Sequence, residues 1–320
     1  MNLKISGIGY YLPDNIETSE ELAPKIGKSI DWINSRTGVK ERRVSDIDVD
    51  LMGAKAAKLA LKDEIPDLIL NASGVGKQVI PDTSVFIQKQ LGFKGIPSFT
   101  LHSTCLSFLV ALHTAAHFIS QGTYKKILIV SADRGTRGRN FDEPESAALL
   151  GDAAAAILVE QALENEQSCM LDFTMNTYPE GLHLTEVRGG GTNLHPHDKE
   201  TKFSDNLFSM NGPMIYKMAR KIVYNQIQLD LKNNNLKVDD IDLVVPHQAS
   251  GLAVKAYSKY GGFKKDKIVN ILEKTGNCVA ASLPLALAIA FEENKFKRGD
   301  LIYFIGTGAG LSVASCLLRY

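Results

Sequence analysis

The sequence predicts an α/β protein built from two similar halves. Two observations support this fold class. Short apolar runs rich in β-branched residues alternate with helical patterns, as in a largely buried sheet covered by helices. Similar segments also recur at an offset of about 170 to 175 residues, which indicates a duplication. We expect one half over residues 1–165 and the other over residues 166–320, joined at the polar stretch Glu160–Ser168.

In chain order, the apolar runs and periodic segments predict the following elements. The strands are Leu3–Ile8, Leu68–Ala72, Ser98–Leu101, Lys126–Ser131, Ala153–Glu160, Leu243–Pro246, Leu301–Gly306 and Leu311–Leu318. The helices are Ser29–Thr37, Leu51–Leu61, Asp82–Leu91, Leu106–Ser120, Pro213–Asn233, Gly251–Tyr260 and Ala280–Asn294. Gly38 closes the first helix, and Pro213 suits a helix start because its missing N–H costs nothing there. Only Tyr178–Asn211 has no regular pattern, and we expect this long loop over the mouth of a site.

The repeat relates chemically interesting positions. Asp67–Ser73 has its counterpart in Asp242–Gln248, and Lys126–Ser131 in Leu301–Gly306. The strand and helix that flank Cys105 correspond to a segment containing Asn277. If the halves pack face to face, Cys105, His247 and Asn277 meet at a shared centre.

Composition excludes several classes of protein. The apolar share of 44% permits a sizeable core, and Lys+Arg equals Asp+Glu at 36 each, so no overall field attracts nucleic acid or an anionic membrane. The four cysteines are scattered without a CxxC pair, which argues against a disulfide framework or a zinc site. The N-terminus lacks the apolar block of a signal peptide, and the run Cys278–Phe291 is too short to span a bilayer. We expect a cytoplasmic protein without a membrane span.

Three residues form the candidate catalytic group. Cys105 lies where an apolar strand gives way to a helix, and the positive end of the helix dipole favours its thiolate. His247 and Asn277 each follow a predicted strand, where an imidazole and an amide would stabilise the oxyanion or enolate of acyl chemistry. Taken singly, each residue also has a purely structural explanation. Together they favour an acyl-transferring enzyme.

Several other motifs can each be interpreted in two ways. Gly306–Gly310 lacks the helix and the acidic residue that a dinucleotide loop needs, so we expect the Gly308 N–H to be an oxyanion donor, the alternative being a plain hairpin. Trp32 and Arg36 suit a nucleotide, unless the indole only packs its helix. His113 and His117 lack a third ligand, and we expect no metal. Two basic runs are either solvated faces or a docking surface for an acidic carrier protein: Lys217, Arg220 and Lys221, and Lys255, Lys259, Lys264, Lys265 and Lys267.

These residues carry a family likeness. Pro246–Ser250 and Gly276–Leu287 resemble the histidine and asparagine motifs of the thiolase-superfamily condensing enzymes, most closely the 3-oxoacyl-(acyl-carrier-protein) synthase III family. Asp31–Arg43 is similar to that family's coenzyme A segment, and Gly151–Asp152 and Gly306–Gly310 to its glycine-containing strand ends. The resemblance, which runs nearly end to end, implies a five-layer αβαβα fold and a homodimer.

The resemblance also implies a mechanism. Cys105 takes an acyl group from an acyl-CoA while the N–H groups of Cys105 and Gly308 form the oxyanion hole. A malonyl thioester, carried by coenzyme A or by acyl carrier protein as the expected partner, then loses carbon dioxide. His247 and Asn277 stabilise the enolate that attacks the acyl-enzyme in a decarboxylative Claisen condensation. No metal or redox cofactor is implied.

The chain departs from the family pattern at several positions. Leu106 and Ser107 follow the cysteine where a small residue and glycine are usual, Leu252 replaces an arginine used in carrier docking, and Pro213 replaces an asparagine that touches pantetheine. No arginine precedes Gly151 to enclose the adenine. These departures favour an unusual donor or acceptor, and two roles stay open: fatty-acid initiation, and a specialised fatty-acid or secondary-metabolite pathway.

Alternatives stay open for the identity of the second substrate and for the class of reaction. Head-to-head condensing relatives carry a glutamate where this chain has Ile80, which in a family dimer would reach the partner's acyl tunnel. Acyl transfer to a non-malonyl acceptor and thioester hydrolysis by Cys105 are further possibilities. A papain-like hydrolase uses the same residue types, but its cysteine lies near the mature N-terminus. A non-catalytic partner subunit would not need the intact triad.

Overall fold

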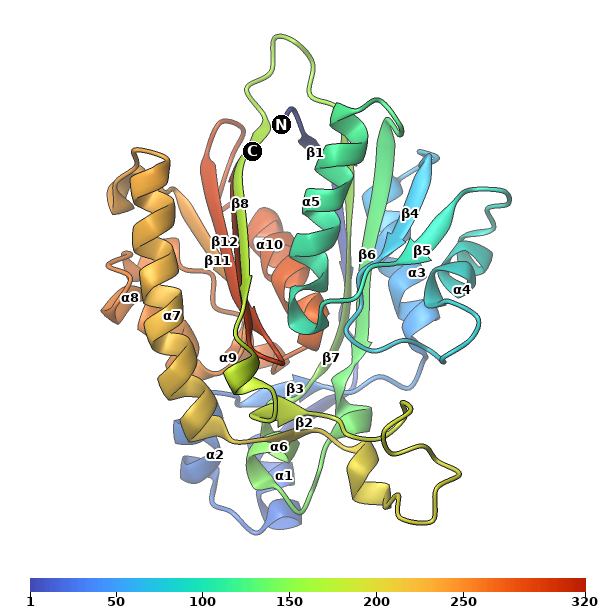
Figure 1. Cartoon of the computed structure of the whole chain (residues 1–320), viewed down its shortest axis with the longest axis vertical. Helices are drawn as coiled ribbons and strands as arrows, with labels where there is room; N and C mark the ends of the chain where they lie inside the picture. Colours follow the sequence, from blue (N-terminus) through green and yellow to red (C-terminus); the bar gives the residue numbers. More distant parts are fainter.

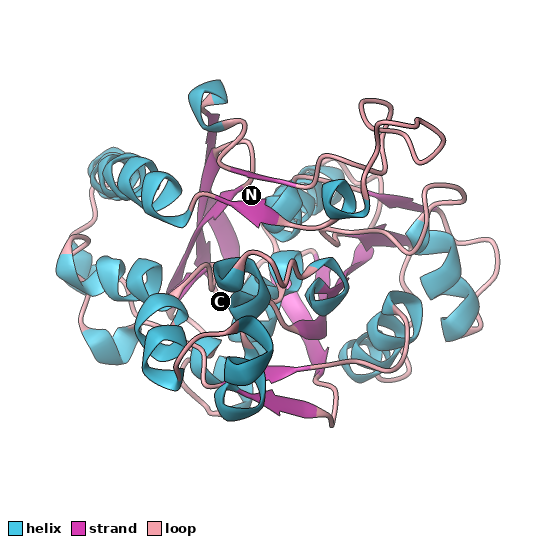
Figure 2. Cartoon of the chain, turned by 90° about the horizontal axis from the view of Figure 1, so that it is seen from below, coloured by secondary structure: helices cyan, strands magenta, loops and turns pink.

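The computed structural model describes residues 1–320 and has five layers that alternate between helices and sheets. In Figure 1 a sheet stands on each side of a central layer that contains two helices, and further helices cover the outer face of each sheet. Figure 2 views the molecule from below, the side on which a small cap lies in Figure 1. The expected αβαβα architecture is confirmed.

The first sheet belongs to the N-terminal part of the chain. Its strand order is β1-β7-β6-β4-β5, with β4 parallel to β5 and β6 and the other pairs antiparallel. The bounds are β1 Lys4–Tyr11, β4 Leu68–Asn71, β5 Ser98–Thr100, β6 Lys126–Arg134 and β7 Asp152–Glu160. The helices on its outer face are α3 (Val49–Leu61) and α4 (Thr83–Leu91).

The second sheet repeats this order. Strand β11 is parallel to β12, as β4 is to β6, and β13 and β8 follow antiparallel, as β7 and β1 do. A single bridge between Val244 and Ile268 marks the place that β5 takes in the first sheet. The bounds are β8 Cys169–Thr177, β11 Leu243–Pro246, β12 Leu301–Gly308 and β13 Ser312–Arg319. The outer helices are α7 (Gly212–Asn233) and α8 (Gly251–Lys259).

All expected strands and helices are present within a few residues, but the sequence analysis missed β8. This edge strand has one buried residue, Met170, and mostly half-exposed ones, so it lacks a clear apolar signal. The expected division after residue 165 lies in the connection between β7 and β8 and stays a prediction.

The two central helices begin in the same way. They are α5 (Ser107–Ser120) and α10 (Ser282–Glu292), and each follows a short 3₁₀ turn. The first residue of each turn has a positive φ, 50° at Thr104 and 52° at Val279. The first serine of each helix accepts a backbone N–H at 2.9 Å from the residue that precedes the turn. The repeat therefore extends to the strained corners that carry Cys105 and Asn277.

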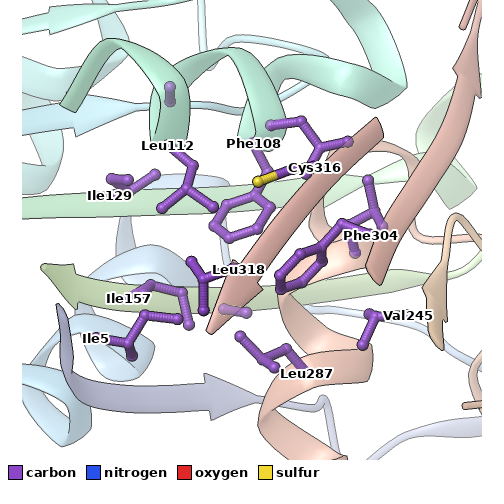
Figure 3. Packing of buried hydrophobic residues seen from close by; sticks show 14 of the residues in the cluster. Ile5, Phe108, Leu112, Ile129, Ile157, Val245, Leu287, Phe304, Cys316 and Leu318 are labelled. Carbon is purple, nitrogen blue, oxygen red and sulfur yellow. The ribbon is translucent and has the colours of Figure 1, made fainter. Parts of the chain in front are cut away.

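The largest apolar cluster fills the space between the two sheets. It contains 38 buried residues from both parts of the chain, and Figure 3 shows Phe108 and Leu112 of α5 close to Phe304 of β12 and Leu318 of β13. The Phe108 and Phe304 rings meet edge to face with centroids 6.2 Å apart. Separate clusters lie beneath α3 and beneath α7 and α8. Because the largest cluster joins the two sheets, the two parts of the chain share one core.

A small cap lies at one end of the layers, and sequence analysis found only its helix α2. Its elements are β2 Ile16–Thr18, α1 Ser19–Ile26, α2 Ile30–Thr37, β3 Glu41–Arg43, α6 Pro144–Leu149 and α9 Leu272–Thr275. The fully buried Arg42 donates hydrogen bonds to the Ala148 carbonyl, which ties β3 to α6. These short elements, one of which contains Pro24, carry little periodic signal.

The segment expected to be irregular contains one small sheet. β9 (Thr185–Glu186) pairs with β10 (Ser209–Met210), and the rest consists of loops and short 3₁₀ turns. Pairing through so few residues gives no sequence signal. Among all the helices, none combines the length and the apolar character needed to cross a membrane.

Truncating the core at Phe108 will destabilise the whole molecule. Phe108→Ala removes a fully buried ring, so the free energy of unfolding should fall by about 3–5 kcal/mol in denaturant titration. Phe203→Ala, at a position where the side chain is 81% exposed, should change it by less than about 0.5 kcal/mol. Equal effects of the two substitutions would contradict the assignment of the core.

Candidate active site

A cavity of about 390 Å³ lies where residues of both parts of the chain meet. Cys105, His247, Asn277 and Gly308 all line it, and Arg36 lines its mouth. The cavity begins beside the ends of β11 and β12 and continues between α7 and α8. The fold thus brings the candidate catalytic side chains together from three distant segments.

Cys105 occupies the middle of the 3₁₀ turn that precedes α5. The end of β12 packs closely against this turn, since a Cβ on Gly308 would lie only 2.6 Å from the Thr104 hydroxyl oxygen. Glycine is therefore required at this point. Its absence of a side chain lets the backbone of residue 308 approach the Cys105 turn.

The expected bias toward a Cys105 thiolate is wrong for the unliganded protein. Burial, and after it the charge of the Asp133 carboxylate, raise the pKa of the Cys105 thiol to about 12. The cysteine also lies in a 3₁₀ turn before α5 rather than in the helix itself. Loss of hydration and a nearby negative charge outweigh the backbone hydrogen bond that lowers this pKa, so the resting thiol is protonated at neutral pH.

His247 follows β11 and is almost fully buried, with 3% of its surface exposed. Its backbone N–H donates to the Ile305 carbonyl at 2.9 Å, which fixes it beside β12. A Cβ on Gly306 would lie 2.9 Å from the His247 Cβ, so β12 has no room for a side chain at position 306. Burial lowers the pKa of His247 to about 4, and its Nδ1 atom has no hydrogen-bond partner. The imidazole is therefore neutral at pH 7.

The Asn277 side chain is held through its oxygen. Oδ1 accepts hydrogen bonds from the Val279 N–H at 2.9 Å and the Ser282 hydroxyl at 3.4 Å. The amide nitrogen makes only a long contact of 3.4 Å with the carbonyl of Ala249, another cavity residue. This arrangement leaves the amide N–H group as the donor available to a ligand.

Asn277 is also anchored to the first part of the chain through its backbone. Its N–H donates to the Leu149 carbonyl at 2.9 Å, and its own carbonyl accepts from the Gly151 N–H at 3.0 Å. A Cβ on Gly151 would lie 2.0 Å from the Thr275 carbonyl oxygen. Only glycine at position 151 permits this contact, which explains the family-like Gly151–Asp152 motif.

Asp133 holds together two segments near the site, and the sequence analysis did not identify it. Its buried carboxylate, at the end region of β6, accepts N–H bonds from Gly74, Val75 and Ala281. Burial raises the pKa of Asp133 to about 7 despite these donors. The carboxylate therefore joins the loop after β4 to the turn before α10. Its only sequence signal is an acidic residue directly after an apolar strand.

Only one of the two residues expected to bind coenzyme A lines the cavity. Arg36 lines the cavity, and its Nε atom lies 3.6 Å from a Glu145 carboxylate oxygen. Trp32 is half-buried against the apolar cluster of the cap and does not line the cavity. A phosphate bound by Arg36 would compete with Glu145. From the loop expected over the mouth, Thr185, Phe208 and Met210 line the cavity.

Of the basic candidates Arg220 lines the cavity, whereas Ile80, His113 and His117 lie outside it. Ile80 is 81% exposed, on a loop where Val79 is 85% exposed. His113 and His117 have their Nε2 atoms 3.1 Å apart, and no group of three or more histidine, cysteine, aspartate or glutamate side chains is arranged to hold a metal ion. All four cysteines are free.

Comparison with known proteins yields one family. Residues 99–179 match the family model of 3-oxoacyl-[acyl-carrier-protein] synthase III, and residues 231–320 match the model of its C-terminal part. The chain is 33% identical to the beta-ketoacyl-[acyl-carrier-protein] synthase III of Natranaerobius thermophilus, over 100% of this chain and 99% of that protein. The corresponding enzyme of Clostridium acetobutylicum is 31% identical with the same coverage.

Solved structures agree. The 3-oxoacyl-[acyl-carrier-protein] synthase III of Aquifex aeolicus superimposes with a TM-score of 0.91 and 30% identity, over 99% of this chain and 100% of that one. The priming β-ketosynthase of the R1128 polyketide pathway gives a TM-score of 0.89 and 25% identity, over 99% and 96% of the two chains.

The protonation states predict a distinctive pH dependence of thiol reactivity. Because the pKa of Cys105 is raised to about 12, the thiolate fraction should grow about tenfold per pH unit between pH 6 and 9. The alkylation rate of Cys105 by iodoacetamide, followed by peptide mass spectrometry, should rise in parallel. The imidazole of His247 should not titrate in this range. A rate plateau below pH 8 would show a thiolate at rest and contradict this prediction.

Proposed function

The chain belongs to the 3-oxoacyl-[acyl-carrier-protein] synthase III family, and from this membership we propose a function for the cavity residues. Enzymes of this family are condensing acyltransferases, and this chain is one of them. We propose that Cys105 carries an acyl group from an acyl-CoA and that a malonyl or related thioester then captures it. The observation that carries this proposal is the convergence of Cys105, His247 and Asn277 on one cavity.

In the first half-reaction, the Cys105 sulfur attacks the thioester carbonyl of the donor. A new carbon–sulfur bond forms, the donor's carbon–sulfur bond breaks, and coenzyme A leaves as a thiol with the Cys105 proton. The N–H groups of Cys105 and Gly308 stabilise the intermediate oxyanion, a role supported by the close packing of Gly308 against the Cys105 turn. The resting thiol is neutral, so its proton must be removed during attack rather than before it.

In the second half-reaction, the malonyl thioester loses carbon dioxide, and its thioester oxygen takes up negative charge as an enolate. The N–H groups of the neutral His247 imidazole and of the Asn277 amide donate hydrogen bonds to this oxygen. The enolate carbon attacks the acyl-enzyme, and Cys105 departs as a thiolate that is reprotonated. The orientation of the Asn277 amide supports this role, since its oxygen is already engaged.

We propose acyl carrier protein and a second copy of the chain as partners. The outer faces of α7 and α8 carry exposed lysines, Lys217 and Lys221 on one and Lys255 and Lys259 on the other, which suit an acidic carrier. For the dimer, the loop that contains Val79 and Ile80 is apolar and exposed, and β5 is an edge strand. In this arrangement Ile80 reaches the acyl tunnel of the partner.

Cys105→Ala and Asn277→Ala should separate the two half-reactions. Incubation with a panel of acyl-CoA compounds should add acyl mass to the parent protein and to Asn277→Ala, but not to Cys105→Ala, as seen by intact-mass spectrometry. Condensation with malonyl thioesters should fall by about 100-fold or more in Asn277→Ala because one donor to the enolate is lost. Equal labelling of Cys105→Ala would falsify the nucleophile assignment, and rapid loss of the label to water would indicate a hydrolase.

The dimer should be visible in sedimentation velocity as a species of twice the 35.0 kDa chain mass. Ile80→Asp places a charge in the proposed apolar contact and should shift the protein toward the monomer. Leu163→Asp, at an exposed position in the β7–β8 connection, is the matched control and should leave the dimer intact. A parent protein that sediments only as a monomer would refute the proposal.

A further inference from the structure

The cavity continues well past the catalytic residues, into a groove between α7 and α8. We define this α7–α8 groove by the following lining residues: Val223, Tyr224 and Ile227 of α7, and Ala256, Tyr257, Tyr260 and Gly261 of α8 and its end. They line the same cavity as Cys105. Along α7, Gly212 at the mouth and Ile227 at the floor are about 22 Å apart, at 1.5 Å per residue. The cavity therefore extends beyond the space that a short acyl group at Cys105 would fill.

The groove lies along a part of α7 whose side chains are largely not buried. In α7 the buried residues are Gln226, Ile227, Asp230 and Leu231, so the earlier turns have no buried side chain. Small residues face the gap on the other side, including Ala256 and Gly261. A Cβ on Gly261 would already lie 3.2 Å from the Ile227 side chain. Ile227 and Tyr257, both nearly fully buried, close the floor.

The groove is chemically uniform. Its defining residues are all uncharged, and the charged side chains in contact with them, Arg220 and Lys259, both lie at Tyr260. The Arg220 guanidinium lies over the Tyr260 ring at 5.0 Å and donates to the Tyr260 hydroxyl at 3.2 Å. It also lies 5.9 Å from the Tyr216 ring, so the two tyrosine rings stabilise its charge at the edge of the groove. Nothing in the groove is arranged to bind a phosphate or carboxylate, and apart from the tyrosine hydroxyls its lining is apolar, as suits a hydrocarbon.

We infer that the α7–α8 groove binds the hydrocarbon chain of a thioester substrate whose carbonyl lies at Cys105. This inference rests on the proposed function of Cys105 and adds the class of substrate, a long-chain acyl thioester. The site differs from the proposed contact at Ile80, because the groove is formed within one chain. Each methylene that enters it should improve binding by about fourfold. The apolar residues Pro213 and Leu252, which line the same cavity, give the chain an apolar path.

Two substitutions that fill the groove test the inference. Ala256→Phe and Val223→Phe place a ring in the space between the helices, far along α7 and α8 from the catalytic residues. Leu229→Phe, at an exposed position of α7 outside the cavity, is the matched control. Thermal unfolding and acylation by acetyl-CoA show whether each variant is folded and whether Cys105 is intact.

The experiment has two arms, because the chain could belong to the donor or to the acceptor. In the first arm, the rate of Cys105 acylation by dodecanoyl-CoA is compared with that by acetyl-CoA. In the second, preformed acetyl-enzyme reacts with malonyl-CoA, which loses carbon dioxide, or with 3-oxododecanoyl-CoA, which loses a C2 proton. In both cases the C2 carbon bonds to the acetyl carbonyl carbon, the bond from that carbon to the Cys105 sulfur breaks, and Cys105 ends as the thiol. We expect the groove variants to lose about tenfold or more with the twelve-carbon compound in one arm, and less than about twofold with the short compound. A loss in the first arm assigns the bound hydrocarbon chain to the donor, and a loss in the second arm assigns it to the acceptor.

Other outcomes overturn the inference. If both groove variants match Leu229→Phe with the twelve-carbon compounds in both arms, the groove binds no acyl chain, although the proposed function stands. If no acyl-CoA, short or long, labels Cys105 in the parent protein, the proposed function fails and the inference fails with it. The two failures are distinguishable, since only the second affects the short-chain reaction.

Discussion

The contact between two similar parts of the chain, through α5 and α10, is the constraint on which the structure depends. Both helices lie in one apolar core between the sheets, and each begins at a corner with a positive φ. A glycine from the other part of the chain contacts each corner closely. Gly308 lies against the Cys105 turn, and the Gly151 N–H donates to the Asn277 carbonyl. The core therefore holds the sheets together and also sets the relative positions of a thiol and an amide that are far apart in sequence.

Burial also determines the charge of the site. The pKa of Cys105 is raised and that of His247 lowered, so a neutral thiol and a neutral imidazole share the cavity at rest. A neutral imidazole can donate a hydrogen bond to a developing enolate without an initial ion pair that would compete for it. The one strong cation at the mouth, Arg36, is paired with Glu145, while the interior extends as an apolar groove. The cavity thus favours apolar acyl groups over free anions.

Much of the fold was predictable because its core elements have strong local patterns. Strands such as β6 and β12 contain continuous apolar runs, and α5 and α10 are predominantly apolar helices, as expected for a buried layer. The missed elements lack such patterns. β8 is a half-exposed edge strand, α6 has six residues, and β9 and β10 have two residues each. Their formation depends on neighbouring segments that a local pattern does not reveal.

The sequence by itself determined the α/β class, the repeat, and the candidate residues Cys105, His247 and Asn277, because strand ends and glycine-rich corners leave local signals. Only the tertiary structure decided their chemical state and surroundings. The protonation of Cys105 depends on the desolvation and the Asp133 charge that folding brings to it, and Arg36 enters the cavity while Trp32 packs into the cap. The groove between α7 and α8 likewise depends on how two separate helices pack. Such properties arise from contacts between distant segments, and composition and spacing do not specify them.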